Sequence, residues 1–387
     1  MSSQLKVNSI SDAAGANGNA ITLATDGTCT AKITNNLSNR NLIINGACAV
    51  AQYASSSTSA GYKTVDRYKA EGSNTGQTAT QSQQSLSSSD TGPWEKGFRK
   101  YYRLALAGTG TANVNAWASM QQRVEAQNIA CSGWDYTSAS SNITLSFWFR
   151  ASTNQTFYSY IYAYDGTPKA YTFSFTASGN NTWTKVTKTI PGNSGITVDN
   201  DNGAGLQISL IAFAGTNYTN NRTLNTWAAH DGNNYAPDMA TTWITTGTPT
   251  FDLTGVQLEV GDHATEFEMR SYAQELQLCK RYYQKHAPVN ADHMIWGWGR
   301  AESNTGRIGL PIAVPMRTTP TVYAAKNRLM KYQGTASDST DTPSVLTNWV
   351  SESNVYTIDF GGHSLDHNNM YNLTSNADSG LTLSSEI

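Results

Sequence analysis

The side chains best suited to chemistry in this sequence are aromatic residues that recur at every second position of short segments. Sugar rings present C–H faces that stack on Tyr and Trp, while their hydroxyls bond to polar side chains. The pattern therefore predicts either a glycan-binding face or a face that packs against a sister subunit, because large exposed aromatic patches mark interfaces of some kind. The candidates are Tyr158, Tyr160, Tyr162 and Tyr164 in segment 157–164, Trp148 and Arg150 on a neighbouring strand over 143–150, and Trp296 and Trp298 further along.

Catalytic signatures are missing from the sequence. It contains no G-x-S-x-G, Walker loop, H-E-x-x-H or C-G-x-C element. Glu266 and Glu268 flank Phe267 and would share one face of a strand. A glycosidase pair needs two carboxylates across a cleft, whereas most carboxylates are simply exposed or ion-paired. We therefore expect no catalytic residues, and a protein that is not an enzyme.

Metal-ligand patterns are weak. The run Asp199-Asn200-Asp201-Asn202-Gly203 invites a calcium site, but Leu210 stands where an EF-hand loop needs its bidentate Glu. A turn is the better interpretation. His363 and His367 would be spaced as ligands only on a helix, and the Gly and Asn residues beside them favour a loop. We expect neither a metal nor a cofactor.

Composition and charge exclude other classes of function. The chain has 387 residues, of which 14% are charged, and Lys+Arg 26 against Asp+Glu 28 gives a net charge of −2. Such a balance creates no field that attracts phosphate, so nucleic acid is not an expected partner. No apolar run approaches the ~18 residues of a membrane span. The N-terminus lacks the layout of a signal peptide, which favours synthesis in a cytoplasm.

The elements that must position these residues are short strands separated by Gly, Asn and Ser turns. Their number and spacing predict an all-β protein with a jelly-roll sandwich. Period-two alternation assigns one side of segments 143–150 and 157–164 to the core. The expected strands are 41–46, 64–69, 101–106, 143–150, 157–164, 170–175, 206–210 and 251–259, and the expected core side chains are Ile143, Leu145, Phe147, Phe149, Phe157, Ile161 and Ala163.

Four units follow from these patterns. Residues 1–40 carry few large apolar side chains and cannot bury a core alone, so we expect copies of the chain to complete them. The sandwich spans 41–270. A capping box at Ser271-Tyr272-Ala273-Gln274 opens a linking helix over 271–286. Residues 287–387 return to strand signals and form a small C-terminal β domain.

Many of these segments resemble a family of bacteriophage tail fibre and virion structural proteins from viruses of marine bacteria and cyanobacteria. The resemblance covers 41–285 and lies mostly in framework residues. Its motifs are Asn41–Gly46, Val65–Tyr68, Gln122–Glu125, Thr144–Trp148, Trp183–Lys185, Thr254–Gly261, Ala264–Arg270 and Glu275–Lys285. The segments Met316–Val322 and Leu381–Ile387 are also similar to fibre C-termini.

The resemblance implies a carbohydrate-binding-module jelly roll in a virion appendage that attaches to host surface polysaccharide, as a homotrimer and by multivalent binding. The implied place is the virion, on the tail or particle surface. The segment from Leu5 to Gly27 resembles the short N-terminal segments by which fibres trimerise and dock on other virion proteins. Its candidate attachment residues are Leu5, Val7, Ile10, Ile21 and Leu23. Two alternatives stay open: a purely architectural decoration protein, and a polysaccharide depolymerase.

Overall fold

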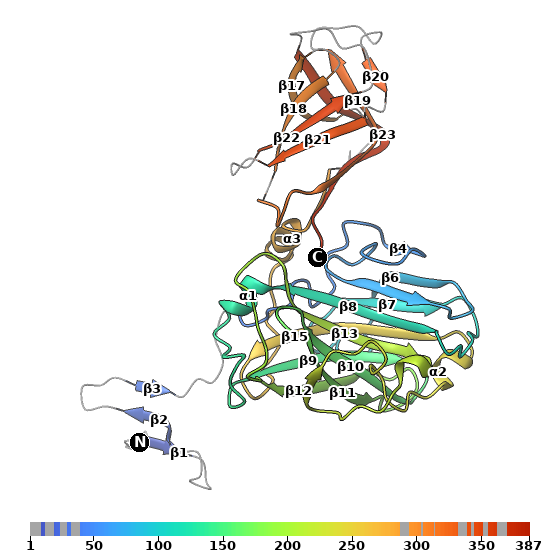
Figure 1. Cartoon of the computed structure of the whole chain (residues 1–387), viewed down its shortest axis with the longest axis vertical. Helices are drawn as coiled ribbons and strands as arrows, with labels where there is room; N and C mark the ends of the chain where they lie inside the picture. Colours follow the sequence, from blue (N-terminus) through green and yellow to red (C-terminus); the bar gives the residue numbers. More distant parts are fainter. Residues whose placement is uncertain are drawn as a thin grey trace, which may run out of the picture.

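Figure 1 shows the computed structural model, in which a central β-sandwich carries strands at both ends of the chain. The structure describes residues 9–11, 19–23, 29–31, 39–286, 294–302, 305–312, 314–331, 339–341, 344–350, 355–361 and 370–387. Side chains are described throughout 39–286 and for parts of the C-terminal strands, including 314–323 and 381–387.

The sandwich consists of two six-stranded sheets. The first, in spatial order, is β14 (Trp227–Ala229), β11 (Lys169–Thr176), β10 (Thr156–Ala163), β13 (Ala204–Ala214), β8 (Trp117–Glu125) and β5 (Lys69–Ser73). The second is β12 (Thr184–Pro191), β9 (Asn142–Ala151), β15 (Thr250–Val260), β7 (Lys100–Leu106), β6 (Ala79–Ser85) and β4 (Ser56–Ser57). The short helical segments of the sandwich are α1 (Ala126–Ala130), η1 (Thr216–Tyr218) and α2 (Thr242–Thr245).

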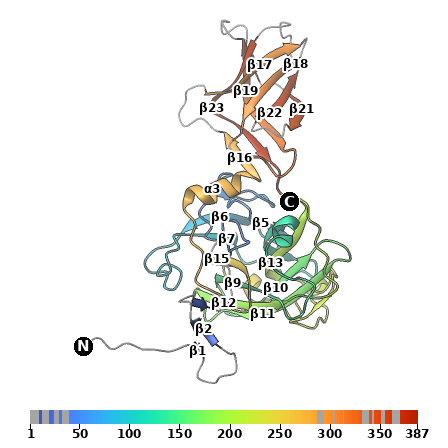
Figure 2. The same ribbon diagram turned by 90° about the vertical axis from the view of Figure 1, so that its left-hand side faces the viewer.

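Most successive strands of the sandwich lie in opposite sheets. The chain crosses between the sheets at eight of the eleven connections and stays within one sheet only from β6 to β7, from β10 to β11 and from β13 to β14. Figure 2 shows the two sheets as separate layers, with β7, β15 and β9 in one and β13, β10 and β11 in the other. Antiparallel pairing with repeated crossing is typical of the jelly-roll arrangement, so the all-β expectation is confirmed.

The core between the sheets is aromatic, and both sheets contribute to it. Phe149 of β9 lies 4.7 Å from Phe175 of β11, ring centroid to ring centroid, at an interplanar angle of 83°. Phe157 of β10 meets Phe251 of β15 at 5.2 Å. The seven core side chains expected from period-two alternation are all 1% exposed or less, so that prediction is confirmed. Edge-to-face rings of this kind hold the layers together.

Two expected strands are wrong. Residues 41–46 and 64–68 form turns, and β5 begins only at Lys69. The Asn45 amide Nδ2 donates to the carbonyls of Val50 and Asp66, both at 2.9 Å, and its Oδ1 accepts from the Val50 N–H at 3.0 Å. The Asn45 side chain thus supplies the hydrogen bonds that a neighbouring strand would have supplied.

The linking helix is shorter than predicted. α3 spans Tyr272–Lys280 and opens with the expected capping box, in which Ser271 Oγ accepts from the Gln274 N–H. Residues Tyr283–His286, expected to be helical, form strand β16 and pair with Leu381–Ser384 of β23. Strand pairing with a distant segment overrides the local helical spacing of Tyr272, Leu276, Cys279 and Tyr283.

The terminal segments form sheets of their own. At the N-terminal end the strands are β1 (Ser9–Ser11), β2 (Asn19–Leu23) and β3 (Cys29–Ala31), all antiparallel. The C-terminal sheet, in spatial order, contains β20 (Ser339–Asp341), β19 (Thr321–Lys331), β23 (Met370–Ser384), β17 (Met294–Glu302), β18 (Thr305–Pro311), β22 (Val355–Gly361) and β21 (Ser344–Val350), with β16 on β23. Among the described helices, none is long and apolar enough to cross a lipid bilayer.

Candidate functional site

The tyrosines of β10 lie on the outer face of the first sheet. Because successive side chains alternate, Tyr158, Tyr160 and Tyr162 point away from the core that holds Phe157 and Ile161. They are not freely exposed, however. Tyr158 and Tyr160 are only 5% and 8% exposed, and the ring of Tyr235, on the segment that follows β14, is stacked on Tyr160.

Beside Tyr160 the outer face is hollowed into a cavity of about 420 Å³, which we call the tyrosine groove. Its volume falls within the ~300–1,000 Å³ typical of ligand pockets. The floor comes from β8, β10 and β13. The rim comes from Tyr218, between β13 and β14, and from Gly232, Asn233 and Tyr235 on the segment that follows β14. The groove is lined by Trp117, Ser119, Gln121, Tyr160, Ile211, Ala214, Tyr218, Gly232, Asn233 and Tyr235.

Strand register places the floor residues in two rows. Tyr160 lies opposite Ser209, which lies opposite Gln121 on the next strand. In the neighbouring row, Ile211 lies between Tyr158 and Ser119. Side chains directly opposite one another on adjacent strands are close enough to touch. The first row thus holds the Tyr160 ring beside a hydroxyl and an amide, and the second holds the Ile211 side chain between the Tyr158 ring and the Ser119 hydroxyl.

Three tyrosines form one wall of the groove. The rings of Tyr160 and Tyr235 are stacked with centroids 4.9 Å apart, and Tyr235 is stacked in turn on Tyr218 at 6.3 Å. The Tyr218 carbonyl accepts from the backbone N–H groups of Tyr235, at 2.9 Å, and Ala236, at 3.2 Å, which ties the segment before β14 to the segment after it. The wall is thus held by both ring stacking and backbone hydrogen bonds.

Polar groups around the floor are held by one another. Gln207 Nε2 donates to Ser209 Oγ at 2.8 Å, and Gln207 Oε1 accepts from Arg123 Nε at 2.9 Å and from the Tyr164 hydroxyl at 2.5 Å. Gln121 Nε2 donates to Ser119 Oγ at 3.0 Å. Such a network fixes side-chain orientation before any ligand arrives.

The groove carries no formal charge at neutral pH. None of the ten described residues that line it is acidic or basic. Burial raises the pKa of Tyr160 and of Tyr235 to about 12, so both hydroxyls stay protonated and neutral at neutral pH. A neutral groove of stacked rings, hydroxyls and amides suits a neutral polyhydroxylated ligand.

Tyr162 and Tyr164 lie beside the groove rather than in its lining. Their rings meet edge to face at 4.3 Å, and the Tyr162 ring also lies 4.3 Å from the His230 ring. The Arg123 guanidinium lies 5.0 Å from the centre of the Tyr164 ring. This cluster supports the floor from one end.

The prediction that Trp148 and Arg150 join the tyrosines in one face is wrong. β9 and β10 are consecutive, but the chain crosses between the sheets at 152–155, so the outward residues of the two strands lie on opposite surfaces of the sandwich. Figure 2 shows this separation. Two stretches far apart in sequence cover Trp148: a Cβ at Gly92 would come within 2.6 Å of its ring and one at Gly255 within 3.1 Å.

Arg150 instead completes a charge network on the second sheet. Its guanidinium bonds to Asp90 Oδ1 at 2.6 Å and to Asp252 Oδ2 at 2.8 Å, and Asp252 also accepts from Arg103 Nε at 2.7 Å. The Asp252 side chain is fully buried. The Arg150 guanidinium therefore helps to neutralise the buried Asp252 carboxylate.

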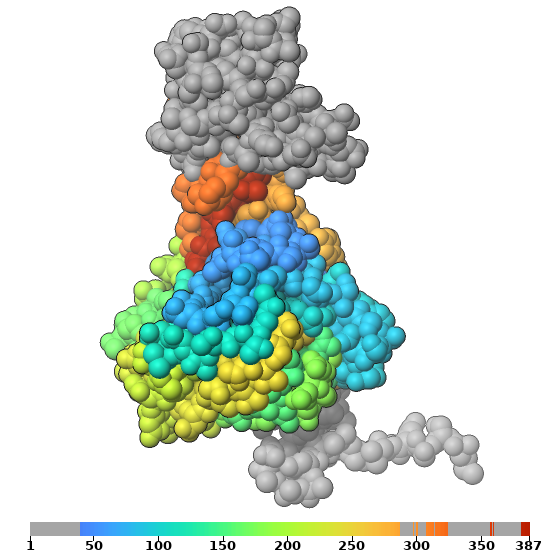
Figure 3. All heavy atoms as spheres, turned by 90° about the vertical axis from the view of Figure 1, so that its right-hand side faces the viewer, coloured from blue at the N-terminus to red at the C-terminus, as the bar shows by residue number. Residues whose placement is uncertain are grey.

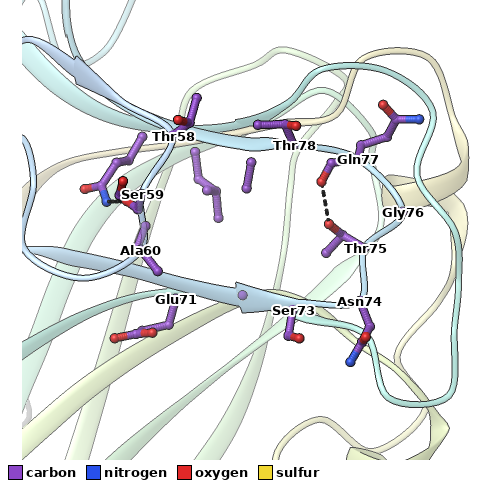
Figure 4. A pocket seen from close by; sticks show the side chains of 15 residues that line it. Thr58, Ser59, Ala60, Glu71, Ser73, Asn74, Thr75, Gly76, Gln77 and Thr78 are labelled. Carbon is purple, nitrogen blue, oxygen red and sulfur yellow. Dashed lines mark hydrogen bonds between the residues drawn. The ribbon is translucent and has the colours of Figure 1, made fainter.

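A larger cavity, of about 540 Å³, lies between β5 and β6 at the edge of the sandwich. Figure 4 shows Thr58 and Ser59 on one side of it and Ser73 of β5 on the other, with a hydrogen bond of 2.9 Å from Thr75 Oγ1 to the Gln77 carbonyl. None of its fifteen described lining residues is aromatic. It offers no ring on which a sugar could stack, so the tyrosine groove is the better candidate.

The remaining sequence candidates lie in the terminal sheets. Trp296 and Trp298 fall on β17, but their side chains lie outside the described part of the structure. Leu5 and Val7 lie outside the described residues, as do His363 and His367. The backbones of Ile10 and Ile21 are cross-strand partners in β1 and β2, and Leu23 follows on β2.

The run 199–203 is a turn, as expected from the sequence. Gly203 N–H donates to Asp201 Oδ1 at 2.8 Å, and the Asp201 carbonyl accepts from the Gln127 N–H at 2.9 Å. Glu266 and Glu268 do not lie on a strand: Glu268 pairs with Arg270, and Glu266 with Lys96. In the part of the chain that the structure describes, no three His, Cys, Asp or Glu side chains gather as metal ligands.

Trp117, Tyr218, Tyr235, Gln121 and Asn233 were not predicted as site residues. The alternation of 117–123, in which Ser119 and Gln121 flank Met120, is a strand signal. It could have placed Trp117 and Gln121 on an outer face. Tyr218 and Tyr235 lie on the segments before and after β14, and no local pattern shows that these segments return over the sheet.

No protein-family model and no curated protein matches this chain. Among solved structures, it is similar to the enzymatically active domain of tailspike protein 4 from bacteriophage CBA120, at 11% identity and a TM-score of 0.31, over 57% of this chain and 21% of that one. It is also similar to TmCBM61 in complex with β-1,4-galactotriose, at 10% identity and a TM-score of 0.30, over 58% of this chain and 100% of that one. A sugar binding protein from Bacteroides thetaiotaomicron VPI-5482, described as putative, matches at 11% identity and a TM-score of 0.30, over 57% of this chain and 99% of that one. Likenesses this distant carry no argument about ligand or activity.

Proposed function

We propose that this chain is a non-catalytic glycan-binding protein and that the tyrosine groove is its binding site. The observation that carries the proposal is the groove itself: a preformed cavity of about 420 Å³ whose lining combines four aromatic residues with Ser119, Gln121 and Asn233. Stacked rings present an apolar face to a sugar, and the fixed polar groups meet its hydroxyls. Because no charged group lines the groove, the ligand is a neutral sugar chain.

The biological setting we propose is a bacteriophage virion, on the tail or particle surface. The resemblance of segments such as Val65–Tyr68 and Thr254–Gly261 to tail fibre proteins supports it. In this setting the protein is a homotrimer whose N-terminal segment docks on other virion proteins, and the groove attaches the particle to host surface polysaccharide. Linking several weak sites raises avidity by ~10²–10⁴ without any new contact.

A glycan array followed by titration calorimetry tests the groove. With the tightest neutral oligosaccharide from the array, Trp117→Ala and Tyr235→Ala are each expected to weaken binding about tenfold, which corresponds to ~1.4 kcal/mol. Trp148→Ala is the matched control, because this half-buried tryptophan lies on the opposite sheet, and it should leave the affinity within about twofold. Equal affinity of all variants, or a wild type that binds no neutral glycan, contradicts the proposal.

The biological setting has its own tests. Light scattering on the full chain should give a mass three times that of the 41.9 kDa chain. Trimers that bind no glycan would favour an architectural protein. Release of oligosaccharides from host polysaccharide would instead show a depolymerase. Reconstruction of the virus particle would show where the chain lies and how many copies are present.

A further inference from the structure

A second cavity, of about 370 Å³, lies where the sandwich meets the C-terminal strands, and we call it the junction cavity. In Figure 3 the orange and red atoms of the C-terminal chain lie directly against the blue atoms of the first part of the sandwich. The sandwich contributes Tyr53, Ala60, Gly61, Tyr62 and Lys63, and the C-terminal strands contribute Tyr283, Tyr323, Thr382 and Ser384.

Three strands form a platform on one side of this cavity. β23 pairs with β16 through Tyr283↔Ser384 and Lys285↔Thr382, and with β19 through Thr321↔Ser384 and Tyr323↔Thr382. Residues opposite one another, and residues two apart, share a face of a sheet. One face of the platform therefore carries Tyr283, Lys285, Thr382, Ser384 and Tyr323. The cavity lining shows that this face lies toward segment 53–63 of the sandwich.

The aromatic side chains of the cavity differ in their contacts and in their exposure to solvent. Tyr53 is stacked on Tyr283 with ring centroids 3.5 Å apart and 17° between the planes. The Tyr62 hydroxyl donates to a main-chain oxygen of Ile387 at 2.5 Å. Tyr323, by contrast, is 61% exposed, the highest value among the large hydrophobic side chains that the structure describes as exposed. Tyr53, Tyr62 and Tyr283 are thus held by contacts within the protein, whereas the ring of Tyr323 is exposed to solvent.

The exposed charged side chains of the lining and of the platform are both lysines. Lys63 belongs to the lining, and Lys285, on the platform face beside Thr382, donates through Nζ to the Tyr53 carbonyl at 3.3 Å. None of the nine described lining residues is acidic. The nearby Glu386 is buried in an ion pair with Arg67, and Asp66 accepts from the N–H of Gln52 at 2.7 Å.

We propose that the junction cavity binds an acidic sugar unit of a polysaccharide, with its ring on Tyr323 and its carboxylate or sulfate beside Lys63 and Lys285. Tyrosine supplies the stacking face, and two lysines attract an anion, which the neutral tyrosine groove does not. Because the lining comes from both the sandwich and the C-terminal strands, such a ligand would also link these two parts. The inference goes beyond the groove and stands independently of it.

Affinity electrophoresis of the full chain tests the proposal, with native gels that contain alginate or polygalacturonate (carboxylate), carrageenan or dextran sulfate (sulfate), or neutral dextran. We expect an acidic polysaccharide to retard the wild type. Tyr323→Ala should weaken this retardation about five- to tenfold, the loss expected for one stacking contact. Lys63→Glu should abolish it, and Lys63→Arg should preserve it. The carboxylate and sulfate gels distinguish the two sources of negative charge.

Tyr272→Ala is the matched control, because Tyr272 on α3 is 60% exposed and lies outside the cavity lining. It should migrate like the wild type, and so should the groove variant Tyr235→Ala, which separates failure of this proposal from failure of the first. A wild type that no acidic polysaccharide retards overturns the proposal. Equal retardation of wild type and Tyr323→Ala also overturns it, since that result indicates diffuse charge attraction.

Discussion

The ring of Tyr160 on β10 lies almost parallel to the ring of Tyr235 on a loop 75 positions later in the chain, with 4.9 Å between centroids and 19° between planes. This contact joins the floor of the tyrosine groove to its rim. It gives the groove its aromatic wall, because Tyr218 then continues the stack. The stability of the loop and the affinity for a glycan should therefore respond to the same side chain.

The first prediction separates the Tyr235 ring from its hydroxyl. Tyr235→Phe keeps the stacked ring and should hold glycan affinity within about threefold, whereas Tyr235→Ala should lose about tenfold. The hydroxyl bonds to His230 Nε2 at 3.3 Å, a long contact, so its removal should matter little. Titration calorimetry with a neutral oligosaccharide measures both variants. Equal loss in the two would show that the hydroxyl, and not the ring, contacts the ligand.

The second prediction concerns Arg150 and stability. Arg150→Ala leaves the buried Asp252 with Arg103 as its remaining ion-pair partner among those the structure describes. Hydrogen bonds to charged groups contribute ~1.5–3 kcal/mol each, so the free energy of unfolding should fall by about 2 kcal/mol. Urea denaturation measures this change. Glycan affinity should stay at the wild-type value, and a loss of affinity without a loss of stability would return Arg150 to the list of binding residues.

The third prediction concerns pH and Asp66. Burial raises the pKa of this carboxyl from 3.8 to about 7, with the nearby Glu386 adding to the rise. The folded protein therefore binds a proton that the unfolded chain releases between these two values. Proton binding at Asp66 therefore stabilises the folded state. This contribution is fully present below pH 3.8 and is lost as the pH rises through about 7, so Asp66 alone makes the free energy of unfolding fall with pH in that window.

Melting temperatures of wild type and Asp66→Asn between pH 4 and pH 7.5 measure this contribution. The substitution removes the titrating group, so the curve of the variant should descend less steeply than that of the wild type. Arg67 and Glu386, the charged neighbours, are unchanged and serve as the common background. Parallel curves would show that Asp66 titrates at its ordinary pKa.

The fourth prediction tests the helix cap. Ser271→Ala removes the oxygen that accepts from the Gln274 N–H and should lower the free energy of unfolding by ~1 kcal/mol. Ser271→Asp restores an acceptor at the helix N-terminus and should recover most of this loss. Urea denaturation measures both variants. If the alanine and aspartate variants were equally destabilised, the serine would act through something other than its cap.

The sequence by itself determined which side of a strand faces the core. In 143–150 and 157–164, alternation assigns Phe149 and Phe157 to the interior, and both are fully buried. The reason is local: successive side chains of a strand must point to opposite faces. The start of α3 is local in the same way, since Ser271 and Gln274 are three residues apart and satisfy each other's backbone.

Only the tertiary structure decided which strands share a sheet and what covers each face. Trp148 and Tyr158 are ten residues apart, yet the chain crosses between the sheets at 152–155 and sends them to opposite surfaces. Tyr235 reaches Tyr160 because a loop folds back over β10. Strand partners and loop paths follow from packing between segments distant in sequence, which the period of one segment does not record.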